Sequence, residues 1–167
     1  LESARLATST RIVYTSDHGD NLGARGLWGK STLYEESAGV PLIMAGPDIA
    51  AGRVVATPVS HIDCAPTFLD LTGAPRPRGA DSLPGASLVD IANGGTPERP
   101  VLSEYHAIGS VAGAFMLRFD RWKYCHYVAY GPQLFDLTSD PEETIDLAGD
   151  PRHRDLLAEG ERRLRAI

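Results

Sequence analysis

The sequence predicts an α/β fold in which the end of an α/β domain precedes a small antiparallel sheet packed with a C-terminal helix. Two short apolar segments, 11–15 and 40–45, flank a long polar segment rich in glycine. Strand-like segments joined by short turns follow residue 100, and a charged helical segment ends the chain. Strands joined by long connections are typical of α/β domains, whereas short turns favour antiparallel pairing. We therefore predict two domains, 1–100 and 101–167.

The first domain is expected to begin with two buried strands. Residues 11–15 are short and β-branched, which predicts a buried strand with parallel pairing. Residues 40–45 predict a second buried strand, ended by a turn at Gly46-Pro47-Asp48. The segment 16–37 between them is long, polar and without periodicity. Such a segment usually forms a functional loop.

A helix is expected after residue 60, followed by a long surface connection. Ser60 is suited to cap the helix, Asp63 falls in its first turn, and Gly73 is suited to end it. Residues 74–100 are rich in Pro and Gly, which predicts a connection on the surface.

The second domain is expected to be a small antiparallel sheet followed by a helix. Strands are predicted at 101–105, 114–118 and 122–127. Asp120-Arg121 forms a tight connection between the last two, so they should pair antiparallel. Asp140-Pro141-Glu142-Glu143 combines a cap, an N1 proline and an N3 glutamate, which favours a helix start. Asp150-Pro151 repeats the cap and proline before a final charged helix.

The composition excludes several function classes. The 167 residues are 43% hydrophobic and 23% charged, which is ordinary for a globular protein. The net charge is −6 without a basic cluster, so we expect no nucleic-acid partner. No apolar run has the length of a membrane span, so we expect no membrane partner. Cys64 and Cys125 lack a metal-binding spacing and are interpreted as buried free thiols.

A candidate metal site follows the first predicted strand. In open α/β sheets, ligands bind beyond the carboxyl ends of the strands. Asp17 offers a hard carboxylate oxygen and His18 an imidazole nitrogen, and the two together can bind one divalent ion. Gly19 allows the backbone to turn behind them. The alternative is that Asp17 caps a helix and His18 is a surface residue.

A candidate anion site follows the metal site. Lys30 is flanked by Gly29 and by the hydroxyl residues Ser31 and Thr32, so its compact ammonium can reach an anion. The spacing of these residues is not that of a P-loop. The alternative is that Lys30 is an ordinary solvated side chain.

Together the segments resemble the type I sulfatases of the alkaline phosphatase superfamily, in particular choline-sulfatase-like and arylsulfatase-like enzymes. The resembling segments follow the family order, and they are residues 11–15, 17–19, 29–35, 40–43, 60–73, 121–124, 133–137 and 140–143. The resemblance implies that the chain is the C-terminal part of an alkaline-phosphatase-like α/β fold.

The resemblance also implies roles for individual residues. Asp17 and His18 correspond to ligands of a divalent cation, which is usually Ca²⁺, with Mg²⁺ or Mn²⁺ as alternatives. Lys30 corresponds to the catalytic lysine that donates to a sulfate oxygen of the substrate. His106, at a strand end, is a further candidate for substrate contact. A cation and an ammonium placed beforehand stabilise the charge that develops as the S–O bond breaks.

The family's nucleophile is missing from this sequence. It is a formylglycine made from Cys or Ser in a Cys/Ser-x-Pro-Ser-Arg motif. The segment Cys64-Ala65-Pro66-Thr67-Phe68 imitates this motif but has Phe68 where arginine is required, so we interpret Cys64 as a core residue. The family's N-terminal acidic ligands are also missing. We therefore expect a missing N-terminal part of the same enzyme as a partner, and no turnover by the isolated chain.

The sequence thus predicts a sulfuric ester hydrolase that acts on a small-molecule sulfate ester. One alternative is a phosphonate monoester or phosphodiester hydrolase of the same superfamily. Another is a non-catalytic module that binds a metal or an anion. Association into a homo-oligomer is left open.

Overall fold

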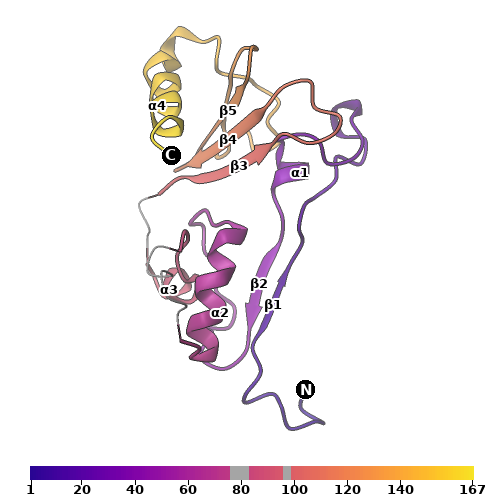
Figure 1. Cartoon of the computed structure of the whole chain (residues 1–167), viewed down its shortest axis with the longest axis vertical. Coiled ribbons are helices and arrows are strands. Elements are labelled where there is room, and N and C mark those ends of the chain that lie inside the picture. Colours follow the sequence, from indigo (N-terminus) through magenta and orange to yellow (C-terminus); the bar gives the residue numbers. More distant parts are fainter. Residues whose placement is uncertain (76–82, 96–98) are drawn as a thin grey trace. The chain divides into compact units, whose positions relative to one another are not determined.

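The structure is a computed structural model that describes residues 1–75, 83–95 and 99–167 (Figure 1). It divides into two compact units, and each unit combines two stretches of the chain. Unit 1 is Leu1–Asp17 with Pro41–Glu98, and unit 2 is His18–Val40 with Arg99–Ile167. The domain division at residue 100 stays a prediction. Among the described residues, no helix has both the length and the apolar character needed to cross a membrane.

Two strands of unit 1 pair with each other. β1 (Ile12–Thr15) and β2 (Leu42–Ala45) are antiparallel, with Tyr14 opposite Ile43. The predicted parallel pairing is therefore wrong, because the chain returns from residues 16–41 in the opposite direction without a crossover. The predicted burial is also wrong, since Tyr14 is 61% and Ile43 59% exposed. An apolar run indicates a strand, but it does not indicate the neighbour of that strand.

The helix expected after Ser60 is confirmed in unit 1. Ser60 precedes a 3-10 turn that continues into α2 (Cys64–Thr72), and the carboxylate of Asp63 accepts the Ser60 N–H at 2.8 Å. Gly73 ends the helix with a φ of 65°, a left-handed conformation that glycine adopts without strain.

The sequence did not predict the next helix, α3 (Leu88–Ala92). It lies within the stretch 74–100 that was expected to be a surface connection. The helix is too short to be stable by itself, and the N–H of Leu88 donates to the hydroxyl of Thr67 in α2 at 2.8 Å. Residues 76–82 and 96–98 of the expected connection lie outside the described residues.

Unit 2 contains a four-stranded antiparallel sheet in the order β3-β4-β5-β6. Its strands are β3 (Val101–Tyr105), β4 (Ala114–Phe119), β5 (Trp122–Tyr127) and β6 (Gln133–Asp136). The three predicted strands and the tight turn at Asp120-Arg121 are confirmed. β5, which carries His126, is an inner strand because β6 pairs with its far side.

The sheet of unit 2 is covered on both faces because its side chains alternate between them. One face packs against α4 (Arg154–Leu164), with a core that includes Leu117, Tyr124 and Leu134 (Figure 1). A Cβ added to Gly160 of α4 would lie 2.7 Å from Cγ of Tyr124, so only glycine allows this close approach.

The opposite face of the sheet packs against the segment that carries Lys30. Leu33 is buried with Met116 and Cys125, and α1 (Glu35–Ala38) follows it directly. Unit 2 therefore has three layers, which are α4, the sheet and the segment His18–Val40.

Two cap-like sequences in unit 2 have different outcomes. Asp140 does not begin a helix, because its carboxylate closes a turn by accepting the hydroxyl of Thr144 and the N–H of Ile145. The predicted helix start at Asp140 is therefore wrong. Asp150 accepts the N–H of Arg152 at 2.9 Å ahead of a 3-10 turn that leads into α4, so the predicted C-terminal helix is confirmed.

Candidate functional site

Two of the predicted site residues meet in unit 2. Nζ of Lys30 lies 2.7 Å from Nε2 of His18. The other ring nitrogen of His18, Nδ1, lies 2.7 Å from the carbonyl oxygen of Gly19. A carbonyl only accepts, so Nδ1 carries the proton and Nε2 presents its lone pair to the ammonium. The ammonium of Lys30 thus donates to the imidazole of His18, and the two groups lie in direct contact.

Buried polar side chains hold the backbone on both sides of Lys30. Asn21 donates through its amide to the carbonyl of Gly29 at 2.5 Å and accepts from the hydroxyl of Thr32 at 3.0 Å. Ser37 donates its hydroxyl to the carbonyl of Lys30 itself at 2.5 Å. Both Asn21 and Ser37 are buried. Their hydrogen bonds fix the position from which the flexible lysine side chain begins.

Gly19 and Asp20 shape the loop beside His18. A Cβ added to Gly19 would lie 2.0 Å from the carbonyl oxygen of Glu36, so this position accepts only glycine. The carboxylate of Asp20 accepts the N–H groups of Leu22 and Gly29 at 2.9 and 3.2 Å. Asp20 therefore stabilises the loop.

Asp17 precedes His18 in sequence but belongs to unit 1, where its side chain is exposed. Asp17 and His18 thus lie in different units, although they are adjacent in sequence. Across residues 1–75, 83–95 and 99–167, no three His, Cys, Asp or Glu side chains converge as a metal site. The two predicted ligands would thus supply only part of a coordination sphere.

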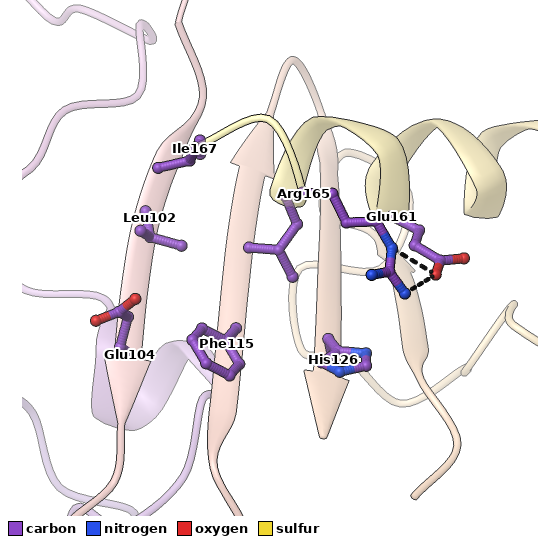
Figure 2. A pocket seen from close by; sticks show the side chains of 8 residues that line it. Leu102, Glu104, Phe115, His126, Glu161, Arg165 and Ile167 are labelled. Carbon is purple, nitrogen blue, oxygen red and sulfur yellow. Dashed lines mark hydrogen bonds and ion pairs between the residues drawn. The ribbon is translucent and has the colours of Figure 1, made fainter. Parts of the chain in front are cut away.

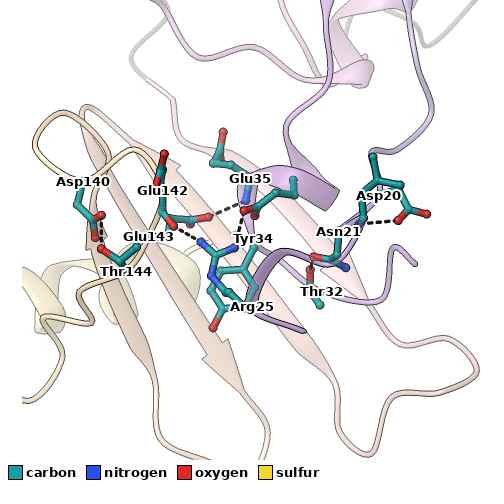
Figure 3. A network of polar contacts seen from close by, with 12 residues as sticks. Asp20, Asn21, Arg25, Thr32, Tyr34, Glu35, Asp140, Glu142, Glu143 and Thr144 are labelled. Carbon is teal, nitrogen blue, oxygen red and sulfur yellow. Dashed lines mark hydrogen bonds and ion pairs between the residues drawn. The ribbon is translucent and has the colours of Figure 1, made fainter. Parts of the chain in front are cut away.

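A buried ion network attaches the segment His18–Val40 to the sheet. Lys123 of β5 is 0% exposed, and its Nζ lies 2.7 Å from Oε1 of Glu143 and 2.9 Å from Oε1 of Glu35. The second oxygen of Glu143 accepts the N–H of Glu35 at 2.6 Å (Figure 3). Burial raises the pKa of Glu143, although the ammonium of Lys123 acts in the opposite direction. One cation thus holds one carboxylate from α1 and one from the segment after β6.

A second attachment is made by Arg25 (Figure 3). Its guanidinium donates to Oε1 of Glu36 at 2.6 Å and to the backbone carbonyl of Glu142, and it lies 4.2 Å from the ring centroid of Tyr34. Partial burial raises the pKa of Glu36, but the hydrogen bond and charge of Arg25, a backbone hydrogen bond and the charge of Lys123 together outweigh it, and the net pKa is lowered. Tyr34, Glu35 and Glu36 therefore fix the loop.

A cavity of about 610 Å³ begins one residue after Lys30, on the face of the sheet that α1 covers. Four tyrosines line it, which are Tyr34, Tyr105, Tyr127 and Tyr130. The hydroxyl groups of Ser31 and Tyr105 lie 2.8 Å apart, and the Tyr105 hydroxyl donates to the carbonyl of Ile108 at 2.9 Å. These bonds connect the Lys30 segment to the loop between β3 and β4.

His106 lies elsewhere. Its ring packs edge-on against Phe115, with centroids 4.8 Å apart, and its Nε2 is 4.0 Å from the carboxylate of Glu104. Phe115 and Glu104 line a second cavity of about 310 Å³ on the α4 face of the sheet (Figure 2). The predicted substrate contact by His106 stays a prediction, and its neighbours lie on the face opposite the Lys30 segment.

Trp28 is 77% exposed and is therefore not a core residue. Nε2 of His61 lies 3.4 Å from the hydroxyl of Thr15. The two cysteines, which were interpreted as buried free thiols, have different outcomes. Cys125 is a buried free thiol as predicted, whereas Cys64, at the start of α2, is only half-buried.

Sequence reasoning missed the Lys123 network. Lysine is rarely buried, so nothing in the strand-like run around Lys123 indicated an ion pair. The one signal was the pair Glu142-Glu143 after Pro141, which was interpreted as a helix start. Glu143 instead has a φ of 51° and is buried against Lys123.

Comparisons with known proteins agree with this architecture. The family described as N-sulphoglucosamine sulphohydrolase, C-terminal, matches residues 23–167. The choline-sulfatase of Rhizobium meliloti (strain 1021) is 44% identical over 152 residues, which cover 91% of this chain and 30% of that enzyme. The chain thus spans about a third of the length of this relative.

Solved structures are similar over nearly the whole chain. A putative sulfatase from Bacteroides thetaiotaomicron superposes with a TM-score of 0.80 at 32% identity, covering 94% of this chain and 35% of that one. The phosphonate monoester hydrolase of Agrobacterium radiobacter superposes with a TM-score of 0.76 at 28% identity, covering 94% and 34%.

Proposed function

Because the chain belongs to the sulfatase family, we propose that it forms the C-terminal part of an enzyme that hydrolyses a sulfate ester. The observation that carries this proposal is the 2.7 Å approach of Nζ of Lys30 to Nε2 of His18. A sulfate group is a tetrahedral anion, and an ammonium held at a fixed point supplies the charge that it requires.

Lys30 is the residue that donates to a sulfate oxygen in this proposal. The buried side chains of Asn21 and Ser37 hold the backbone around Lys30, so the ammonium is placed before the substrate arrives. Placement in advance is what makes such a charge effective, because nothing has to reorganise as negative charge develops on the ester oxygens.

Asp17 and His18 are proposed as two ligands of a divalent cation, with Ca²⁺ first and Mg²⁺ or Mn²⁺ as alternatives. His18 fits this role because its Nδ1 proton is engaged by the carbonyl of Gly19, which leaves Nε2 as the ligating atom. The ammonium of Lys30, which lies 2.7 Å from Nε2 here, would move from it to the sulfate when the cation binds. Asp17 adds an exposed carboxylate next to it in sequence. When bound, the cation would neutralise charge on the sulfate oxygens.

The nucleophile and the remaining ligands are proposed to come from a preceding part of the enzyme. The segment Cys64–Phe68 does not present a nucleophile site, because Pro66 and Thr67 are buried in α2 and the Thr67 hydroxyl donates to the carbonyl of Asp63 at 2.5 Å. The apolar residues exposed on β1 and β2 are proposed to pack against this part. The threefold greater length of the choline-sulfatase relative supports both points.

A second candidate function is the hydrolysis of a phosphonate monoester or a phosphodiester. The similarity to the phosphonate monoester hydrolase of Agrobacterium radiobacter favours it. The ammonium and imidazole of the site serve either tetrahedral anion, so the geometry of these two residues does not separate sulfate from phosphonate.

The test is a paired assay of the full-length enzyme on 4-nitrophenyl sulfate and 4-nitrophenyl phenylphosphonate. We expect kcat/KM for the sulfate to exceed that for the phosphonate. We further expect Lys30→Ala to lower kcat/KM for the sulfate by roughly 10²–10³, as for the loss of one stabilising donor in other enzymes. Arg162→Ala, on the exposed side of α4, is the control and should leave both values unchanged. Higher activity on the phosphonate would favour the second candidate.

A further inference from the structure

Glu143 belongs to the segment after β6, far along the chain from Lys30, yet it is bonded to the helix that follows Lys30. We propose that Glu143 is a positioning residue of the reaction, which acts through α1 to set where Lys30 and His18 lie relative to each other. The inference rests on the proposed function, because it concerns the placement of the groups that bind the sulfate in it.

Ser37, the third residue of α1, is bonded to both sides of the site. Its hydroxyl donates to the carbonyl of Lys30 at 2.5 Å, and its own carbonyl accepts the N–H of Gly19 at 2.8 Å. The carbonyl of Gly19 in turn lies 2.7 Å from Nδ1 of His18. Because these bonds end on one residue, the distance between the two functional side chains depends on where α1 lies.

α1 has four residues, too few to be stable without outside contacts. Glu143 supplies such a contact at the first of them, because its Oε2 accepts the N–H of Glu35 at 2.6 Å (Figure 3). Nζ of Lys123 lies 2.7 Å from the other oxygen of Glu143 and 2.9 Å from the carboxylate of Glu35. The side chains of Glu143 and Lys123 are both 0% exposed, so water does not compete for these bonds. The position of α1 thus depends on Glu143.

The backbone of Glu143 indicates that its placement is imposed. Its φ is 51°, a left-handed conformation that is uncommon for residues other than glycine. Arg25, which donates to the carbonyl of the neighbouring Glu142, has a φ of 54°. Strained backbone persists only where its surroundings fix it, and it is concentrated at functional sites. One strained residue on each of the two joined segments supports a functional role for the contact, beyond packing.

Two variants break the link between Glu143 and α1 in different ways. Glu143→Gln keeps the shape of the side chain, but its single carbonyl oxygen can accept from the N–H of Glu35 or from Lys123, not from both. The double variant Lys123→Met with Glu143→Leu removes both bonds and leaves no charge buried, because the side chain of Glu35 is 42% exposed.

The matched control is Glu142→Gln. It changes the adjacent glutamate, which is exposed, and it keeps the backbone carbonyl by which Glu142 contacts Arg25. The same chemical change is thus made one residue away, outside the link to α1. This variant should leave kcat and KM unchanged.

The measurement is kcat and KM of the full-length enzyme for 4-nitrophenyl sulfate, for each variant alone and combined with Lys30→Ala. We expect Glu143→Gln and the double variant to lower kcat/KM about tenfold, mainly through kcat, because a displaced ammonium stabilises the developing charge less well. Combined with Lys30→Ala, the same changes should cost no more than about twofold, since the group that they misplace is then absent.

The combination with Lys30→Ala separates positioning from folding. A variant that is only less well folded loses the same factor with and without Lys30, and thermal unfolding measures that loss directly. An equal loss in both backgrounds, or an unchanged kcat/KM in both variants, would overturn the inference and leave the proposed function standing. If Lys30→Ala by itself left kcat/KM unchanged, the proposed function and the inference would both be refuted.

Discussion

The two units differ in how completely they enclose their own strands. In unit 2, Leu117 and Leu134 of the sheet are 0% exposed, because α4 covers one face and the segment around Leu33 covers the other. In unit 1, alternate residues of β1 and β2 stay exposed, including Tyr14 and Ile43. Unit 2 therefore carries its own core, whereas the strands of unit 1 have apolar side chains that nothing in unit 1 covers.

This difference matters for the site because the segment with His18 and Lys30 belongs to unit 2. The anion-binding part of the site is thus attached to the well-enclosed unit, and its attachment depends on Lys123, Glu143 and Glu35 rather than on apolar contacts alone. Asp17 belongs to the other unit. The comparison predicts that changes inside unit 2 cost more stability than equivalent changes in unit 1.

The largest effect is expected from Lys123→Met. The methionine fills the space of the lysine stem, but it leaves Glu143 buried without its cation, and breaking a buried pair in this way costs about 3–5 kcal/mol. The measurement is the free energy of unfolding in urea at pH 8. The double variant Lys123→Met with Glu143→Leu should recover most of the loss, because no charge then remains buried.

The matched change in unit 1 is Arg11→Met. Arg11 forms an ion pair with Asp48 at 2.7 Å, but the side chain of Asp48 is 80% exposed, and such pairs contribute about 0–1 kcal/mol. A loss for Arg11→Met as large as that for Lys123→Met would contradict the comparison between the two units.

Thiol labelling compares the two units without any mutation, because each unit has one cysteine. Its expected effect is smaller. Burial raises the pKa of Cys125 to about 12, so at pH 8 only about one thiol in ten thousand is ionised. Partial burial and the charge of Asp63 also raise the pKa of Cys64, but this thiol is reachable from solvent. A thiol reagent at pH 8 should therefore modify Cys64 and spare Cys125 until the protein unfolds. Equal labelling of both cysteines in the folded protein would show that unit 2 opens readily.

The sequence predicted the fold best where local signals decide the outcome. The turn at Asp120-Arg121 between two strand-like runs determines the β4–β5 hairpin, and Ser60 with Gly73 determines the limits of the helical segment. Prediction failed for α3, which depends on a hydrogen bond from another helix. It also failed at Asp140, because the same cap-like carboxylate can close a local turn with Thr144 and Ile145 instead of beginning a helix.

The candidate site shows the same division. Lys30 and His18 were found from residue types and order, and the structure places their side chains together. Asn21 and Ser37, which hold the backbone around Lys30, were not found. They act through hydrogen bonds to backbone carbonyls, which no sequence pattern reveals. The cavity beside Lys30 combines residues from four separate stretches of the chain, so only the folded structure indicates it.

The most direct test of the account is a crystal structure of the full-length enzyme with bound sulfate and Ca²⁺. We predict that Nζ of Lys30 lies about 2.7–3.1 Å from a sulfate oxygen, with the cation on Nε2 of His18 and bound to the same anion. A sulfate bound at a distance from Lys30, or a cation bound away from Nε2 of His18, would contradict the account.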